Sequence, residues 1–183
     1  MSLPFRYLPE SLHDADAVMR WCTNGPSWQH ENIRLFGRVV RVPRMVAWYG
    51  DPGIRYGYSG LQHAAEGWPK PLRALREELT ERLGMNWNFV LLNRYRDGRD
   101  WMGWHRDDEK EMRGPVASVS LGATRRFRLR DGDERYHLDV EHGSVVLFDG
   151  RLRHTLTRTS KPVGERFNLT FLFIDELAQR ADS

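Results

Sequence analysis

The chain has 183 residues, of which 40% are hydrophobic and 29% are charged, and its mean hydropathy is -0.65. This length is enough to bury the core of one domain, and no apolar run approaches the ~20 residues that a membrane-spanning helix needs. The single cysteine, Cys22, excludes an intramolecular disulfide and a multi-cysteine metal cluster. Residues 1–6 lack the charged and then apolar pattern of a secretory signal. We therefore expect a cytoplasmic protein that is a monomer and binds no membrane.

The charge balance is basic. The 28 basic residues outnumber the 25 acidic ones, the formal net charge is +3, and the pI is near 9.2. All but three of the basic residues are arginine, whose planar guanidinium binds phosphate and carboxylate through paired hydrogen bonds. A GC-rich genome would also favour arginine, so this bias permits a nucleic-acid partner without establishing one.

The N-terminal half contains two predicted helices and a basic hairpin. An amphipathic pattern over 9–22 predicts a short helix that ends before Gly25 and Pro26. Residues 28–46 alternate as strands do, with a turn at Phe36-Gly37, and the glycine- and tyrosine-rich segment 47–60 predicts a loop with short strands. Leucines at helical spacing over 72–83 predict the second helix.

Short strands dominate from residue 87 onward. The buried or alternating runs are 89–92, 116–121, 127–130, 136–140, 144–148, 152–157 and 167–174. Regularly spaced strands, with helices gathered in the N-terminal half, predict an α+β and mainly β fold, a sandwich or jelly roll with helical support. Because no linker or internal repeat is visible, we expect a single domain over 1–183.

A histidine and an aspartate at alternate positions form a candidate metal site. His105 and Asp107 lie in the segment 104–109, and residues two apart on an extended strand point to the same side. A third ligand could come from a distant strand, and His154 lies in one. Two imidazoles and one carboxylate leave positions open for a co-substrate and dioxygen, which suits non-haem Fe(II). The H-x-D pattern by itself is weak, because a surface ion pair gives it more often.

Polar residues on the neighbouring apolar strands could hold the co-substrate. Arg166 begins an apolar C-terminal strand, and an arginine buried there needs an anion. A dicarboxylate bound to the metal at one end would bring its other carboxylate to such an arginine, whereas a core aspartate or glutamate is the alternative partner. Asn93 and Tyr95 share a face on the strand before the metal motif and could donate hydrogen bonds to the same molecule, or could cap the strand end.

Taken in order, these segments resemble the AlkB family. The segments are N-F-V-L-L-N-R-Y-R-D-G, W-H-R-D-D-E, G-P-V-A-S-V-S-L-G, His154 and R-F-N-L-T-F. AlkB proteins are Fe(II)- and 2-oxoglutarate-dependent dioxygenases that repair alkylated nucleobases, and the resemblance covers about residues 34–173. The N-terminal segments L-F-G, V-P-R, Y-G-D and Y-G-Y-S-G-L make the chain most similar to the double-strand-preferring branch.

The resemblance implies a double-stranded β-helix, or jelly-roll, core with a nucleotide-recognition lid. The N-terminal helix, the basic hairpin and the lid would lie within 1–60, and a helix and the dioxygenase core within 61–183. The implied ligands of the iron, which uses 2-oxoglutarate and dioxygen as co-substrates, are His105, Asp107 and His154. The implied residues of the 2-oxoglutarate pocket are Asn93, Tyr95, Arg166, Asn168 and Thr170. One position departs from the family, because Leu172 stands where a second arginine is usual, and a cationic contact is lost there.

The basic hairpin is the first candidate nucleic-acid contact. Its arginines are Arg34, Arg38, Arg41 and Arg44. They lie around Leu35 and Phe36, and such a hairpin could bind phosphates while its apolar tip fills the space that a flipped base vacates. The alternative is a basic edge strand with Phe36 in the core. The resemblance favours the wedge.

The second candidate contact is a pocket for the flipped base. Tyr56 and Tyr58 share one strand face, and by resemblance Tyr58 stacks on the base, whose other side meets His105. The carboxylates of Asp108 and Glu109 would accept hydrogen bonds from an exocyclic amine and favour a cationic methylated base. A solvated acidic patch is the alternative for these two residues.

The sequence thus predicts an oxidative demethylase that removes the methyl group of 1-methyladenine and 3-methylcytosine as formaldehyde. The expected partner is alkylated DNA, with RNA as a second candidate. One alternative is a dioxygenase of the same chemistry that acts on protein or a small molecule, in which the basic hairpin would have no obvious task. The other is a catalytically idle nucleic-acid binder, against which the intact set of metal ligands argues.

Overall fold

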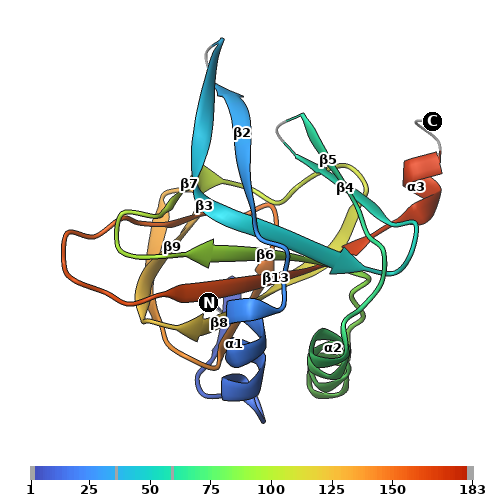
Figure 1. Cartoon of the computed structure of the whole chain (residues 1–183), viewed down its shortest axis with the longest axis horizontal. Coiled ribbons are helices and arrows are strands. Elements are labelled where there is room, and N and C mark those ends of the chain that lie inside the picture. Colours follow the sequence, from blue (N-terminus) through green and yellow to red (C-terminus); the bar gives the residue numbers. More distant parts are fainter. Residues whose placement is uncertain (1–2, 36, 59, 181–183) are drawn as a thin grey trace.

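The computed structural model describes residues 3–35, 37–58 and 60–180 (Figure 1). The strands are β1 (Phe5–Leu8), β2 (Gln29–Leu35), β3 (Arg38–Gly50), β4 (Arg55–Tyr58), β5 (Leu61–Ala64), β6 (Phe89–Tyr95), β7 (Met102–His105), β8 (Met112–Gly122), β9 (Arg125–Asp131), β10 (Glu134–Val140), β11 (Ser144–Asp149), β12 (Arg153–Leu156) and β13 (Arg166–Ile174). The helices are α1 (Ala15–Asn24), α2 (Lys70–Leu83) and α3 (Glu176–Arg180). No helix of the described chain is long and apolar enough to cross a bilayer.

Two antiparallel sheets face each other, and α1 and α2 cover the outer face of the larger one. The larger sheet has the order β1-β11-β8-β13-β6-β3-β2, and the smaller one has the order β10-β9-β12-β7. One apolar core joins α1 and α2 to the larger sheet, and a second core lies on that sheet's other face and includes Phe127 and Leu129 of the smaller sheet. Paired sheets of this kind form a jelly roll, so the predicted fold class is confirmed.

The two main helices begin and end where their caps allow. The Asp14 side chain accepts a 3.0 Å hydrogen bond from the Ala17 N–H and caps α1. The prediction that this helix begins at residue 9 is therefore wrong, since the Ser11 N–H before it donates a hydrogen bond to the Gly143 carbonyl in the turn that precedes β11. Helix α2 ends at Gly84, directly after the predicted stretch 72–83, and the φ of 68° at Gly84 is a left-handed conformation that favours glycine.

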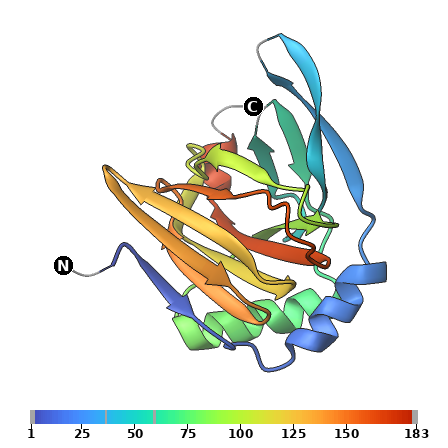
Figure 2. The ribbon, with the colours of Figure 1, turned by 90° about the vertical axis from the view of Figure 1, so that its left-hand side faces the viewer.

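Two hairpins project from the end of the molecule opposite α1 and α2, as Figures 1 and 2 show. The predicted hairpin is formed by β2 and β3, and β4 pairs with β5 in a second, smaller one. The predicted loop over 47–60 is wrong at its start, because β3 continues to Gly50 by pairing with β6. Buried Val46 and Ala47 place this part of β3 in the cores. Strand β1, which pairs with β11, was not predicted from the sequence.

Candidate active site

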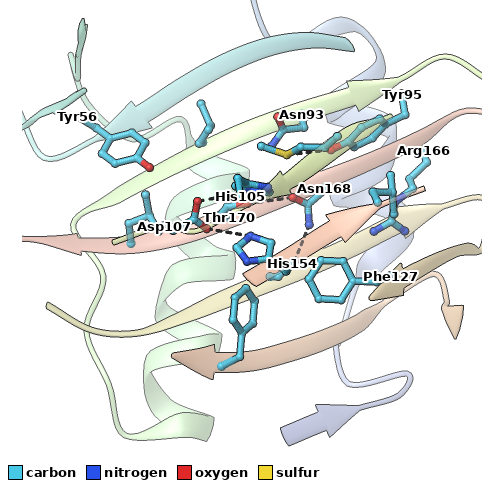
Figure 3. A pocket seen from close by; sticks show the side chains of 16 residues that line it. Tyr56, Asn93, Tyr95, His105, Asp107, Phe127, His154, Arg166, Asn168 and Thr170 are labelled. Carbon is cyan, nitrogen blue, oxygen red and sulfur yellow. Dashed lines mark hydrogen bonds and ion pairs between the residues drawn. The ribbon is translucent and has the colours of Figure 1, made fainter. Parts of the chain in front are cut away.

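The candidate metal ligands meet between the two sheets. Strand β7 pairs with β12 so that His105 lies opposite His154. Asp107 follows β7, and its backbone N–H donates a 2.9 Å hydrogen bond to the Gly150 carbonyl. A Cβ at Gly150 would collide with the Asp107 carbonyl, so only glycine allows this close approach. The ligand atoms of the three side chains lie within 4.8 Å of one another (Figure 3).

Backbone carbonyls orient both imidazole rings toward the carboxylate. The Nδ1 of His105 lies 2.8 Å from the Gly103 oxygen, and the Nδ1 of His154 lies 2.9 Å from the Leu152 oxygen. A carbonyl only accepts hydrogen bonds, so each Nδ1 carries a proton and each Nε2 faces the carboxylate as the ring atom that can bind a metal. These Nε2 atoms lie 3.6 Å and 3.4 Å from the carboxylate oxygens of Asp107. The donor set fits Fe(II) with open coordination positions.

The close packing of the three ligands shifts the pKa of each one. Burial lowers the pKa of His105 to about 4, and the neighbouring charge of His154 acts in the same direction. Burial raises the pKa of Asp107, but the charge of His154 and its hydrogen bond outweigh that effect and hold the pKa below its usual value. Burial lowers the pKa of His154, but the charge of Asp107 and a hydrogen bond to it outweigh burial and hold that pKa above its usual value. A neutral imidazole and an ionised carboxylate are the forms that bind a metal, so His105 and Asp107 are ready to bind it and the metal competes with a proton at His154.

An inner cavity extends from these ligands between the sheets (Figure 3). At the far end lies Arg166, which is 2% exposed. It donates hydrogen bonds to the Ser120 hydroxyl at 2.9 Å and to the Val140 carbonyl at 3.3 Å, while its buried Nε has no partner. Burial lowers its pKa to about 10. No carboxylate in the described part of the chain forms an ion pair with Arg166, so the side chain is a buried cation with a free donor, and it fits the far carboxylate of 2-oxoglutarate.

The other predicted co-substrate residues line the same cavity: Asn93, Tyr95, Asn168 and Thr170. They come from β6 and β13, which pair so that Asn93 lies opposite Asn168. Asn168 donates to the Ser118 hydroxyl at 2.7 Å and accepts from the Thr170 hydroxyl at 2.9 Å. These polar groups therefore hold one another in fixed orientations around the cavity.

The departure at Leu172 leaves the cavity with one cation. Leu172 lines the cavity and is 1% exposed. Among the described residues that line the cavity, Arg166 is the only arginine or lysine. The charge that balances a bound dicarboxylate there must therefore come from Arg166 and the metal.

An outer pocket of about 450 Å³ opens on the other side of the metal ligands. His105 and Asp107 line both spaces, so the ligands stand at the junction. The outer pocket also contains Tyr58 and Glu109. Glu109 accepts a 3.1 Å hydrogen bond from the Tyr56 hydroxyl, and burial, aided by the charge of Asp107, raises its pKa to about 7.

Two predicted substrate contacts lie elsewhere than expected. Asp108 is exposed and is not part of the pocket lining, because it points away from the side that Asp107 and Glu109 share. Arg44 is 6% exposed, so it is no outer phosphate contact; its Nε donates a 2.6 Å hydrogen bond to Asn93 and it lines the outer pocket.

The tip of the hairpin is described only in part. Arg38 and Arg41 are exposed on β3, and Arg41 also lines the outer pocket. Phe36 and the side chains of Arg34 and Leu35 lie outside the described residues.

A buried polar cluster behind Tyr58 has no counterpart in the sequence predictions. The Glu31 carboxylate accepts a hydrogen bond from the Tyr58 hydroxyl and lies 3.0 Å from His63 Nε2. The Trp48 ring packs on His63 with centroids 4.2 Å apart. Because Glu31 belongs to β2, Tyr58 to β4 and His63 to β5, this cluster ties the two hairpins together and fixes the tyrosine at the pocket wall.

The fold and this ligand geometry define a non-haem iron oxygenase. The chain belongs to the 2OG-Fe(II) oxygenase superfamily, whose sequence profile matches residues 5–171. The prediction of an Fe(II)- and 2-oxoglutarate-dependent chemistry agrees with this family and with the ligand set.

Known relatives confirm the resemblance to AlkB proteins. The chain is 38% identical over 155 residues to the DNA oxidative demethylase ALKBH2 of Homo sapiens, covering 76% of this chain and 59% of that protein. It is 34% identical over 179 residues to the alpha-ketoglutarate-dependent dioxygenase alkB homolog 3 of Homo sapiens, covering 87% and 62%. The chain thus spans less than two thirds of these relatives.

Solved structures support the fold. OsALKBH1 superposes with a TM-score of 0.66 at 16% identity, covering 94% of this chain and 99% of that one. A 2OG-Fe(II) oxygenase family oxidoreductase from Burkholderia pseudomallei superposes with a TM-score of 0.64 at 14% identity, covering 92% and 84%.

Proposed function

We propose that this protein is an Fe(II)- and 2-oxoglutarate-dependent oxidative demethylase that acts on N-methylated bases in nucleic acid. The observation that carries the proposal is the position of the metal ligands between two chambers. The inner chamber ends at Arg166, which suits a dicarboxylate, and the outer one has the aromatic and acidic lining that suits a methylated base. The relatives named as DNA oxidative demethylases support the same reading.

The inner chamber positions the co-substrate. Arg166 binds the far carboxylate of 2-oxoglutarate through its free Nε–H, and Asn93 and Asn168 border the path to the metal. The surrounding side chains leave little room for water around the reacting end. Bound Fe(II), with 2-oxoglutarate and dioxygen as co-substrates, would supply the oxidising chemistry that hydroxylates an N-methyl group while 2-oxoglutarate is converted to succinate and carbon dioxide; the N-hydroxymethyl group then breaks down to formaldehyde and the unmethylated nitrogen.

The outer chamber positions the base. Tyr58 presents a ring on which the base stacks, with His105 bordering the pocket on the metal side. Glu109 accepts a hydrogen bond from the exocyclic amine and offsets the positive charge of 1-methyladenine or 3-methylcytosine. The pocket thereby directs the methyl group to the metal ligands.

A panel of methylated oligonucleotides, both single- and double-stranded, tests the proposal through release of succinate and formaldehyde. We expect formaldehyde from oligonucleotides that contain 1-methyladenine or 3-methylcytosine. If the folded, Fe(II)-loaded protein releases no formaldehyde from any member of the panel, the demethylase proposal fails and a dioxygenase that acts on protein or a small molecule replaces it.

The cytoplasmic location, the monomeric state and the single-domain organisation stay predictions from the sequence.

A further inference from the structure

The outward face of the smaller sheet carries a row of arginines that the active site does not use. Arg153 of β12 lies opposite Arg130 of β9, and Arg130 lies opposite Arg135 of β10. Residues directly opposite each other on antiparallel strands project to the same face. The three guanidinium groups therefore belong to one line across three neighbouring strands.

Alternation along the strands sets the direction of this row. His154 and Leu129, which are sequence neighbours of Arg153 and Arg130, are buried toward the inner core. Side chains one position away on a strand point to the opposite face, so the arginines point away from the core. Asp131 and Glu134 pair opposite each other one position further along. They consequently lie on the other face of the strands.

The charge of the row is weakly compensated. Arg126, on the same sheet, forms a 2.9 Å ion pair with Asp139. In contrast, Arg153 and Arg135 form no ion pair with any described residue, and Arg130 forms a long one of 3.7 Å with the fully exposed Asp133. Like charges opposite each other destabilise a sheet, so an anion that binds across the row would relieve this repulsion.

The row begins at the mouth of the outer pocket. Trp104 lines that pocket, is 44% exposed, and lies 6.0 Å from the Arg153 guanidinium. Arg106, which is exposed, lines the pocket beside it. At ~4.8 Å between neighbouring strands, the path from β7 to β10 is about 14 Å long. An aromatic ring followed by a line of arginines is typical of surfaces that bind single-stranded nucleic acid, since bases stack on the ring and phosphates meet the charges.

We propose that the strand that carries the target base leaves the outer pocket over Trp104 and follows the arginine row across the smaller sheet. This inference rests on the proposed function and adds a second nucleic-acid surface, distinct from the β2–β3 hairpin. The row binds the phosphates of the nucleotides on one side of the target base, and Trp104 stacks on the first of these bases.

Equilibrium binding of unmethylated single-stranded DNA of about 16 nucleotides to the metal-free protein tests the surface without turnover. The double variant Arg130→Ala/Arg135→Ala should lose at least about tenfold in affinity. Its plot of log affinity against log salt should become shallower by about 1.4, which is ~0.7 for each lost phosphate contact on a single strand. Trp104→Ala should lose about tenfold or more, and Trp104→Phe should recover most of that loss because it restores a ring.

The matched control is Arg73→Ala/Arg82→Ala, which removes two exposed arginines from α2 on the far side of the larger sheet. An equal loss in this control, or an unchanged salt slope in the row variant, would overturn the proposal. So would a row variant that keeps DNA binding and instead loses binding to vesicles of anionic lipid. If the binding measurements confirm that the arginine row binds DNA while no methylated oligonucleotide is demethylated, the proposed function is wrong and the proposed DNA-binding surface is still supported.

Discussion

The Nε of Arg44 donates a buried 2.6 Å hydrogen bond to Oδ1 of Asn93. Arg44 lines the outer pocket and Asn93 lines the inner cavity, so this contact links the wall of the base pocket to the wall of the co-substrate cavity. Because the arginine fixes the amide, Asn93 presents its N–H groups rather than its oxygen to the cavity.

Loss of this hydrogen bond should affect both substrates. Arg44→Ala leaves a buried amide oxygen unpaired, and a hydrogen bond from a charged donor contributes about 1.5–3 kcal/mol. We expect KM for 2-oxoglutarate to rise about tenfold, together with a rise in KM for the methylated oligonucleotide. The double variant Arg44→Ala/Asn93→Ala should raise the KM for 2-oxoglutarate little more than the single variants do. Fully additive effects of the two changes would contradict the coupling.

Arg166→Met separates co-substrate binding from stability. Removing one partner of a buried ion pair costs about 3–5 kcal/mol, so the KM for 2-oxoglutarate should rise at least a hundredfold. In the absence of 2-oxoglutarate the variant should melt at or above the temperature of the parent, since it replaces an uncompensated buried cation by an apolar side chain. Thermal melts with and without 2-oxoglutarate check both parts. An unchanged KM would show that another residue binds the far carboxylate.

Glu31 should contribute to a fall in the free energy of unfolding as the pH becomes acidic. Burial raises the pKa of this carboxyl, but the close contact with His63 and the hydrogen bond from the Tyr58 hydroxyl outweigh burial and hold the pKa below its usual value of 4.5. A carboxyl whose pKa is lowered on folding adds stability above its unfolded pKa and loses it as the pH falls through the folded pKa. Urea unfolding below pH 4.5 should therefore show a smaller decline in the free energy of unfolding for Glu31→Gln than for the parent. Parallel declines would contradict this account of the cluster.

Phe36→Ala tests the wedge predicted from the sequence. If Phe36 fills the place of a flipped base, its removal should lower duplex demethylation about tenfold to a hundredfold, because stacking contributes about 1–3 kcal/mol. Single-stranded substrate has no partner base to replace, so its rate should change little. The ratio of the two rates, measured beside the melting temperature, decides between a wedge and a core residue. A lower melting temperature with an unchanged ratio would support the core alternative.

The sequence predicted the jelly roll well because strand alternation is local. The convergence of His105 with Asp107 also follows from alternation. The pairing of His105 with His154 depends on register between strands far apart in the chain, so the residues alone offered His154 only as a possible ligand and the family resemblance assigned it. The cluster at Glu31 was missed for the same reason, since its partners lie on other hairpins.

The position of Arg44 had a local signal that the prediction overlooked. Val42, Arg44 and Val46 alternate along β3, and all three are buried. Reading the arginine by its charge alone placed it on the surface with Arg38 and Arg41, which are exposed. The alternation of Arg44 with Val42 and Val46 would have predicted correctly that its side chain is buried.

The most direct test of the account is simultaneous measurement of succinate and formaldehyde from a 1-methyladenine oligonucleotide with Fe(II) and 2-oxoglutarate. The parent should release the two products in equal amounts. Asp107→Ala should release neither while keeping its fold, and the exposed neighbour variant Asp108→Ala should stay close to the parent. Formaldehyde release by Asp107→Ala, or succinate without formaldehyde in the parent, would contradict the assignment of this site to oxidative demethylation.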